Sequence, residues 1–263
     1  MNTVRDAKRI VVKIGSSTLT YENGSLNLRR MEKVARILSD FVNAGKQVVL
    51  VTSAAVAAGR NKMGLDHKPY TTEEKQAMAA VGQCELMSMY ERFFAEYGHT
   101  VAQVLITRDT YENATARKNA TNTLQMLLKM GVVPIVNEND TVSFEEIEFG
   151  DNDTLSACVA ILVSADVLIN LSDIDGLYDS DPHTNPSAKL IPTVDKIDDH
   201  ILAMAGGAGS DRGTGGVVTK LKAAEIAIGS GIEMFLINGT EPDLLYKLFE
   251  GERVGTHFLA EKE

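Results

Sequence analysis

Short runs of apolar, often β-branched residues recur along the chain, and longer mixed segments separate them. The runs occupy residues 10–12, 48–51, 101–106, 132–136, 167–169 and 234–237. Most of them are apolar at consecutive positions rather than at alternate ones. This pattern is typical of strands that helices cover on both faces. The sequence therefore predicts six strands, most of them fully buried.

Two segments between these runs carry apolar residues at spacings of three and four, which predicts amphipathic helices. The stripes are Met31, Val34, Ala35, Leu38 and Phe41 in the first, and Leu155, Cys158, Val159 and Leu162 in the second. Strands that alternate with helices indicate an α/β protein with a mostly parallel sheet between two helical layers. Residues 179–192 are rich in Asp, Pro, Asn and Ser and predict a long surface excursion.

Composition excludes several classes of function. The 263 residues have a formal net charge of −10, which argues against a nucleic-acid surface. No apolar run approaches the roughly 20 residues that span a bilayer. The N-terminus has no signal-peptide pattern, so we expect a cytoplasmic protein. Cys84 and Cys158 lack metal-ligand spacing, and we expect both to be small buried side chains.

The segments that follow the strands carry the candidate chemistry, because ligands gather at the carboxyl ends of parallel strands. Lys13 ends the first strand before Gly-Ser-Ser at 15–17. Small residues at 52–59 follow the second strand and open a helix. Such a turn can present backbone N–H groups to an anion, and close packing of the helix against the sheet is the alternative.

Asn and Asp residues crowd two later segments, 137–140 and 150–154, where turn and N-cap chemistry is an alternative to function. A glycine-rich loop at 213–216 precedes a helix that carries Lys220, which suits a phosphate. Neither a Walker A motif nor a Gly-x-Gly-x-x-Gly fingerprint occurs, so another form of phosphate binding must apply.

Six segments in this order resemble the glutamate 5-kinases. They are Lys13-Ile14-Gly15-Ser16-Ser17, Val51-Thr52-Ser53, Val136-Asn137-Glu138-Asn139-Asp140, Gly150-Asp151-Asn152-Asp153, Leu171-Ser172-Asp173 and Gly213-Thr214-Gly215-Gly216. The resemblance runs from about residue 11 to about residue 255. It implies the amino acid kinase fold, a three-layer αβα sandwich, as a single domain over 1–263. It also implies an amino acid-binding lobe at about 1–165, a nucleotide-binding lobe at about 166–263, and a short form without a C-terminal PUA domain.

Two positions depart from the pattern of that family. Ala54 stands where the family usually has glycine, and its methyl group could crowd the substrate or restrict φ. Val217 and Val218 stand where Met-Ser is common, but Lys220 is retained, so we expect little effect there.

The resemblance also implies roles for particular residues. It assigns catalysis to Lys13, Lys220 and Asp153, with Asp153 orienting both lysines. It assigns glutamate binding to Ser53, Asp140, Asn152 and Asn137, with Asp140 suited to the α-ammonium group. It assigns ATP binding to Lys13, Ser172, Asp173, Thr214, Gly215, Gly216, Val217, Val218, Thr219 and Lys220. Mg²⁺ is expected on the ATP phosphates, with no direct protein ligand.

The activity that the resemblance implies is ATP-dependent phosphorylation of the glutamate side-chain carboxylate, the first step of proline biosynthesis. It further implies inhibition by proline, a homo-oligomer (dimer or tetramer) and hand-off of the product to glutamate-5-phosphate reductase. Two alternatives stay open at this point. One is a kinase for another small acid, N-acetylglutamate or aspartate, and the other is a non-catalytic nucleotide or metabolite sensor of the same fold.

Overall fold

A computed structural model of the chain describes residues 3–142, 152–182, 184–206 and 216–260. An eight-stranded sheet in the order β3-β4-β2-β1-β5-β7-β8-β6 runs through this part of the chain. Its strands are β1 (Arg9–Ile14), β2 (Gln47–Val51), β3 (Val101–Ile106), β4 (Val133–Glu138), β5 (Val167–Ser172), β6 (Thr193–Val194), β7 (Glu233–Asn238) and β8 (Thr256–Phe258). The pairing is parallel except between β7 and β8. All six predicted strands are confirmed, whereas the short β6 and β8 gave no detectable pattern.

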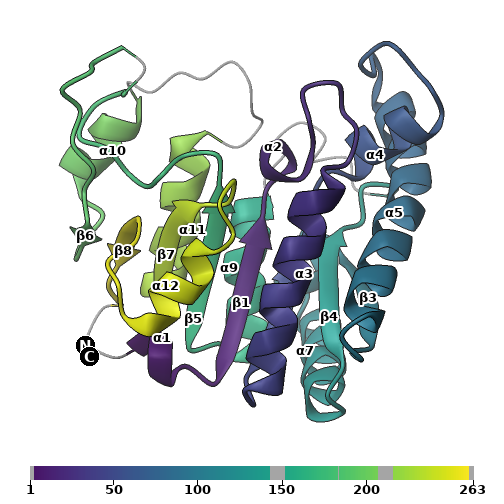
Figure 1. Cartoon of the computed structure of the whole chain (residues 1–263), viewed down its shortest axis with the longest axis horizontal. Coiled ribbons are helices and arrows are strands. Elements are labelled where there is room, and N and C mark those ends of the chain that lie inside the picture. The colour runs from purple at the N-terminus through teal and green to yellow at the C-terminus, as the bar shows by residue number, and fades with distance from the viewer. Residues whose placement is uncertain (1–2, 143–151, 183, 207–215, 261–263) are drawn as a thin grey trace.

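Helices cover both faces of the sheet (Figure 1). Helices α3 (Leu28–Asn43), α5 (Thr72–Ala95) and α12 (Leu244–Glu250) lie in front of it in this view, with α7 (Ala114–Lys129), α9 (Asn152–Val163) and α11 (Val217–Ile228) behind. The described residues also form the helices α1 (Thr3–Asp6), α2 (Ser16–Leu19), α4 (Ala55–Lys62), α6 (Arg108–Glu112) and α10 (Asp199–Gly206).

Two separate apolar cores follow from the alternation of side chains along each strand. Ile10, Val12 and Ile14 of β1 pack in the core that contains residues of α3 and α5. Val11 of the same strand packs in the other core, with residues of α7, α9 and α11. Because successive side chains of a strand point to opposite faces, Lys13 continues the row of Val11 toward α9 and α11. The predicted αβα sandwich with a mostly parallel sheet is therefore confirmed.

The two predicted helix stripes are also confirmed. All five apolar residues of the first stripe lie buried in α3, whose N-cap Asn27 accepts a hydrogen bond from the backbone of Arg30. The second stripe lies in α9, where Leu155, Val159 and Leu162 are buried. Cys158 is only half-buried there, and burial raises the pKa of its thiol to about 11.

Two sequence predictions differ from the structure, and one about a surface segment is confirmed. The expectation that Cys84 is buried was wrong, because it lies on the exposed face of α5. Strand β3 is not fully covered either, since it forms an edge of the sheet and Gln103 is exposed. Segment 179–192 does lie largely at the surface, although Tyr178 pairs with Leu190 across it.

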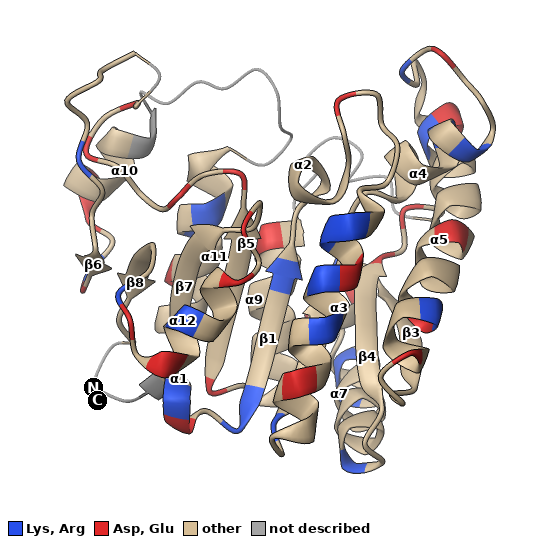
Figure 2. Ribbon diagram, viewed as in Figure 1, with Lys and Arg blue, Asp and Glu red and all other residues tan. Residues whose placement is uncertain are grey.

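Charged side chains lie mainly on helices and loops, and the strands are mostly uncharged (Figure 2). Strand β1 is an exception, because it carries Arg9 at its start and Lys13 near its carboxyl end. Within the described ranges, no helix is long and apolar enough to cross a membrane.

Candidate active site

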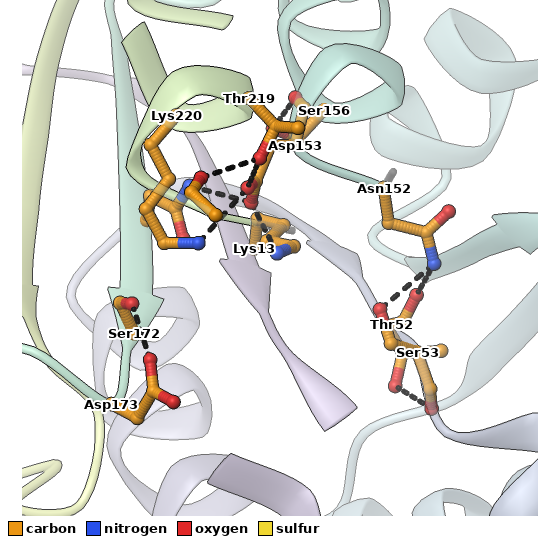
Figure 3. Close-up of polar contacts among 12 residues, drawn as sticks. Lys13, Thr52, Ser53, Asn152, Asp153, Ser156, Ser172, Asp173, Thr219 and Lys220 are labelled. Carbon is orange, nitrogen blue, oxygen red and sulfur yellow. Dashed lines mark hydrogen bonds and ion pairs between the residues drawn. The ribbon is translucent and has the colours of Figure 1, made fainter. Parts of the chain in front are cut away.

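Three charged side chains from distant parts of the sequence meet at the carboxyl ends of the central strands (Figure 3). Lys13 comes from β1, Asp153 from the first turn of α9 and Lys220 from α11. The ammonium of Lys13 donates a hydrogen bond to Oδ1 of Asp153. Nζ of Lys220 lies 3.2 Å from Oδ2 of the same carboxylate. The structure thus brings together the three residues that the sequence assigned to catalysis.

Two neutral groups also contact the Asp153 carboxylate. Nδ2 of Asn170 donates to Oδ1 at 2.8 Å, and Oγ1 of Thr219 lies 3.0 Å from Oδ2. Asn170 is fully buried on β5 and pairs in register with Lys13 of β1. Asn170 was not predicted from the sequence, although a polar residue inside an otherwise apolar strand was a usable signal.

Burial and charge oppose each other at Asp153. The side chain has no exposed surface, and Lys13 and Lys220 are each only 6% exposed. Burial alone would raise the pKa of Asp153, but the two ammonium groups and the hydrogen bonds hold it well below its usual range. The carboxylate is therefore ionised at neutral pH. With two lysines against one carboxylate, the cluster has a surplus positive charge that favours an anion.

A second polar cluster begins one residue earlier on α9. Nδ2 of Asn152 donates to the carbonyl oxygen of Thr52 at 2.7 Å, to Oγ of Ser53 at 2.8 Å and to Oδ1 of Asn137 at 2.9 Å. Figure 3 shows Asn152 turned toward Thr52 and Ser53, while Asp153 is turned toward the lysines. Two consecutive residues of one helix thus serve two adjoining polar clusters.

Asp140 lies two residues beyond the carboxyl end of β4, the strand that carries Asn137. Burial, together with the charge of Glu138, raises the pKa of its carboxyl group to about 6. A carboxylate that is destabilised in this way gains from a cationic partner.

The residues assigned to ATP are described only in part. Ser172 is buried at the end of β5 and donates to Asp173 at 3.1 Å. Gly216 is the N-cap of α11, and Val217, Val218 and Thr219 form its first turn beside Lys220. Thr214 and Gly215 lie outside the described residues.

Ala54, which departs from the family pattern, has a left-handed backbone conformation. Its φ is 77° and its ψ is 15°, directly before α4. This region favours glycine, because a Cβ atom there approaches the following carbonyl oxygen. Position 54 therefore has a backbone conformation that suits glycine, the residue that the family usually has there.

With this geometry in view, comparison with known proteins identifies the class. The model of the amino acid kinase family matches residues 8–238, and the chain belongs to that family. It is 57% identical over 263 residues to a glutamate 5-kinase of Clostridium perfringens strain 13, covering 98% of both chains. It is 50% identical over 265 residues to a glutamate 5-kinase of Listeria innocua, covering 99% of this chain and 96% of that one.

Solved structures show the same fold at low identity. A UMP kinase from Bacillus anthracis gives a TM-score of 0.60 at 20% identity and covers 97% of both chains. An isopentenyl phosphate kinase from T. acidophilum gives a TM-score of 0.63 at 19% identity and covers 95% of this chain and 99% of that one. These likenesses concern the fold alone.

Proposed function

We propose that the protein transfers the γ-phosphoryl group of ATP to the side-chain carboxylate of L-glutamate, giving L-glutamyl 5-phosphate and ADP as the first step of proline biosynthesis. One observation carries the proposal. The buried cluster of Lys13, Asp153 and Lys220 adjoins the amide cluster of Asn152 in a chain 57% identical to a glutamate 5-kinase.

The chemistry of this transfer needs positive charge rather than a base. A glutamate side chain has a pKa of about 4.3, so the attacking oxygen is already ionised at neutral pH. The difficulty is that two anions must meet in line while charge moves toward the leaving phosphate. Both oxygens of Asp153 are engaged by lysines, an amide and a hydroxyl. This supports Asp153 as a residue that orients the lysines rather than one that takes a proton.

Each lysine then acts on one side of the transferred group. Lys13 contacts the phosphoryl group as the new bond to the glutamate oxygen forms. Lys220 neutralises the charge that develops on the β-phosphate as the old bond breaks. The nucleotide is held by the segment before and at the start of α11 together with two residues after β5. These residues are Thr214, Gly215, Gly216, Val217, Val218 and Thr219, with Ser172 and Asp173.

Glutamate lies at the amide end of the site in this proposal. Ser53, Asn137 and Asn152 bind its amino acid head, and Asp140 pairs with the α-ammonium group. The raised pKa of Asp140 supports that pairing, because a nearby cation relieves the cost of its burial.

Mg²⁺ belongs to the proposal as an ion carried by the ATP phosphates, where it neutralises phosphate charge. The donors that surround the Asp153 carboxylate support this, because they leave that group no open position for a metal. Inhibition by proline, assembly as a dimer or tetramer, hand-off to glutamate-5-phosphate reductase and a cytoplasmic location are further parts of the proposal.

The test is an assay of γ-glutamyl hydroxamate with Mg-ATP, glutamate and hydroxylamine. Aspartate and N-acetylglutamate run in parallel, and Lys13→Ala serves as the inactive control. The expected result is product from glutamate alone, which disappears in the control. Product from another acid would keep the mechanism and change the substrate, whereas ATP binding without any product would favour a sensor.

A further inference from the structure

Four side-chain amides form a continuous hydrogen-bonded chain from the edge of the sheet to the amide end of the site. Gln103 of β3 and Gln83 of α5 join at 3.1 Å, and Gln83 and Asn137 of β4 join at 2.8 Å. Asn137 and Asn152 of α9 join at 2.9 Å. We call these four residues the amide chain.

A backbone carbonyl fixes the direction of the amide chain. The carbonyl oxygen of Thr52 can only accept, so the atom of Asn152 that contacts it at 2.7 Å must be the donor Nδ2. The atom of Asn137 that faces Nδ2 must then be an oxygen, so the Nδ2 of Asn137 faces Gln83. Gln83 must in turn present Oε1 to Asn137. This one contact therefore decides which end of each side-chain amide is the oxygen and which is the NH₂ group.

The position of Gln83 is also held firmly. A Cβ atom on the neighbouring Gly82 would lie 1.8 Å from the carbonyl oxygen of Ala55, and one on Gly59 would lie 1.8 Å from that of Met78. Helices α4 and α5 therefore contact each other backbone to backbone, and glycine is required at both positions. Since α4 begins two residues after Ser53, this contact sets the place of α5 relative to the site.

Helix α5 makes a second polar contact to the same place. Tyr90 lies two turns after Gln83 on the same buried face, and its hydroxyl is 2.8 Å from Oγ1 of Thr52. Thr52 is the residue whose carbonyl sets the direction of the amide chain. Gln83 and Tyr90 thus contact Asn137 and Thr52, and both of these residues accept a hydrogen bond from Asn152.

We propose that Gln83 is a positioning residue for the amino acid end of the site, where it accepts from Asn137 and so holds Asn137 and Asn152 in their binding orientation. The inference rests on the proposed function. Gln83 touches no substrate and acts through the other amides. Gln103 contacts the amide chain only through Gln83 and lies at its exposed outer end, so it contributes little.

Three variants separate these roles in the hydroxamate assay, with glutamate and ATP varied in turn and Tm measured for each protein. Gln83→Met keeps the length of the side chain and removes the acceptor. Gln83→Glu keeps an oxygen that accepts from Asn137, whether or not the carboxyl group is ionised. Gln103→Met removes only the outer link.

The expected result is a rise of about tenfold in the KM for glutamate in Gln83→Met, on the scale of one hydrogen bond. Its kcat and its KM for ATP stay within about twofold of wild type, as one lost positioning contact at the glutamate end requires. Gln83→Glu restores the KM to within about threefold, and Gln103→Met leaves it within about twofold.

Ser53→Ala is run beside these variants to test where glutamate binds. If it raises the KM for glutamate and Gln83→Met does not, the inference on Gln83 is wrong and the site stands. If Ser53→Ala leaves that KM unchanged, the glutamate site itself is misplaced and the inference fails with it. If Gln83→Met lowers kcat and Tm and raises both KM values to a similar extent, the role of Gln83 is structural alone and the inference is wrong.

Discussion

Asp153→Asn is the change that tests the charged cluster most directly. The amide has the shape of the carboxylate, but it removes the negative charge that contacts both Lys13 and Lys220. An amide has one acceptor oxygen, so it can serve one lysine while its NH₂ group faces the other. Two ammonium groups, each 6% exposed, then lose the carboxylate that contacts both of them in wild type.

The structure sets the size of the expected effect. Removing one partner from a buried ion pair costs about 3–5 kcal/mol, because the remaining charge is still buried. In a chain of this length, each kcal/mol lowers Tm by about 2–4 °C, so we expect a fall of roughly 6–20 °C. Differential scanning calorimetry at pH 7 measures it. Asp195→Asn is the matched control, because that carboxylate is exposed, and its Tm stays within about 2 °C.

The pH dependence gives an internal check. The pKa of Asp153 is depressed in the folded protein and about 3.9 in the unfolded chain, so its stabilisation is complete above about pH 5. It is lost as the pH falls below about 4, since protons then bind preferentially to the unfolded chain. The gap in stability between wild type and Asp153→Asn therefore stays constant above pH 5 and narrows by about 1.4 kcal/mol per pH unit below pH 4. A Tm within about 2 °C of wild type at pH 7 would refute the reasoning.

Other substitutions test the remaining parts of the site. Lys13→Ala and Lys220→Ala each lower kcat at least about a hundredfold, the scale of one lost electrostatic contact, and near-normal turnover of either variant would contradict the assignment. In wild type the KM for glutamate falls as the pH rises through about 6, because Asp140 must ionise to hold an ammonium group. Asp140→Asn raises that KM and removes this dependence between pH 5 and 8; a raised KM for ATP instead would mean that the two substrate sites are reversed. Ala54→Gly relieves about 1–2 kcal/mol of left-handed strain but loses about 0.4–1 kcal/mol to chain entropy and about 0.8 kcal/mol of methyl burial. Its stability by urea unfolding therefore stays within about 1 kcal/mol of wild type, and a change beyond about 2 kcal/mol would show that the methyl group has a different role.

Much of the sheet was predictable because its strands are buried on both faces. The runs around Val11, Val49 and Leu168 are apolar at successive positions, and these residues are fully buried. Short strands were not predictable, since β6 has two residues and β8 has three, too few to show a period. Exposure of Cys84 was missed for a related reason. Helix α5 has small and apolar residues on several faces, so its sequence does not mark the solvent side.

The site was predictable where residues follow strands and less so where contacts depend on tertiary packing. Lys13, Asp153 and Lys220 stood out because they belong to recognisable segments. Gln83 did not, because a glutamine in a helix is usually a surface residue. Only the tertiary packing of α5, which brings Gln83 beside Asn137 of β4 and Gln103 of β3, buries it. The roles of all these residues in binding and catalysis stay predictions.

The adjacency of Asn152 and Asp153 also makes the reaction sensitive to the length of the substrate. A single peptide unit separates Asn152, which we propose binds the amino acid head, from Asp153, which contacts Lys13. Aspartate has the same head as glutamate and is one methylene shorter, so its carboxylate would stop short of the phosphoryl group. Because a misplacement of about 1 Å can cost about a hundredfold in rate, aspartate would occupy the site and give no appreciable product. Selectivity between the two acids would then lie in turnover rather than in binding.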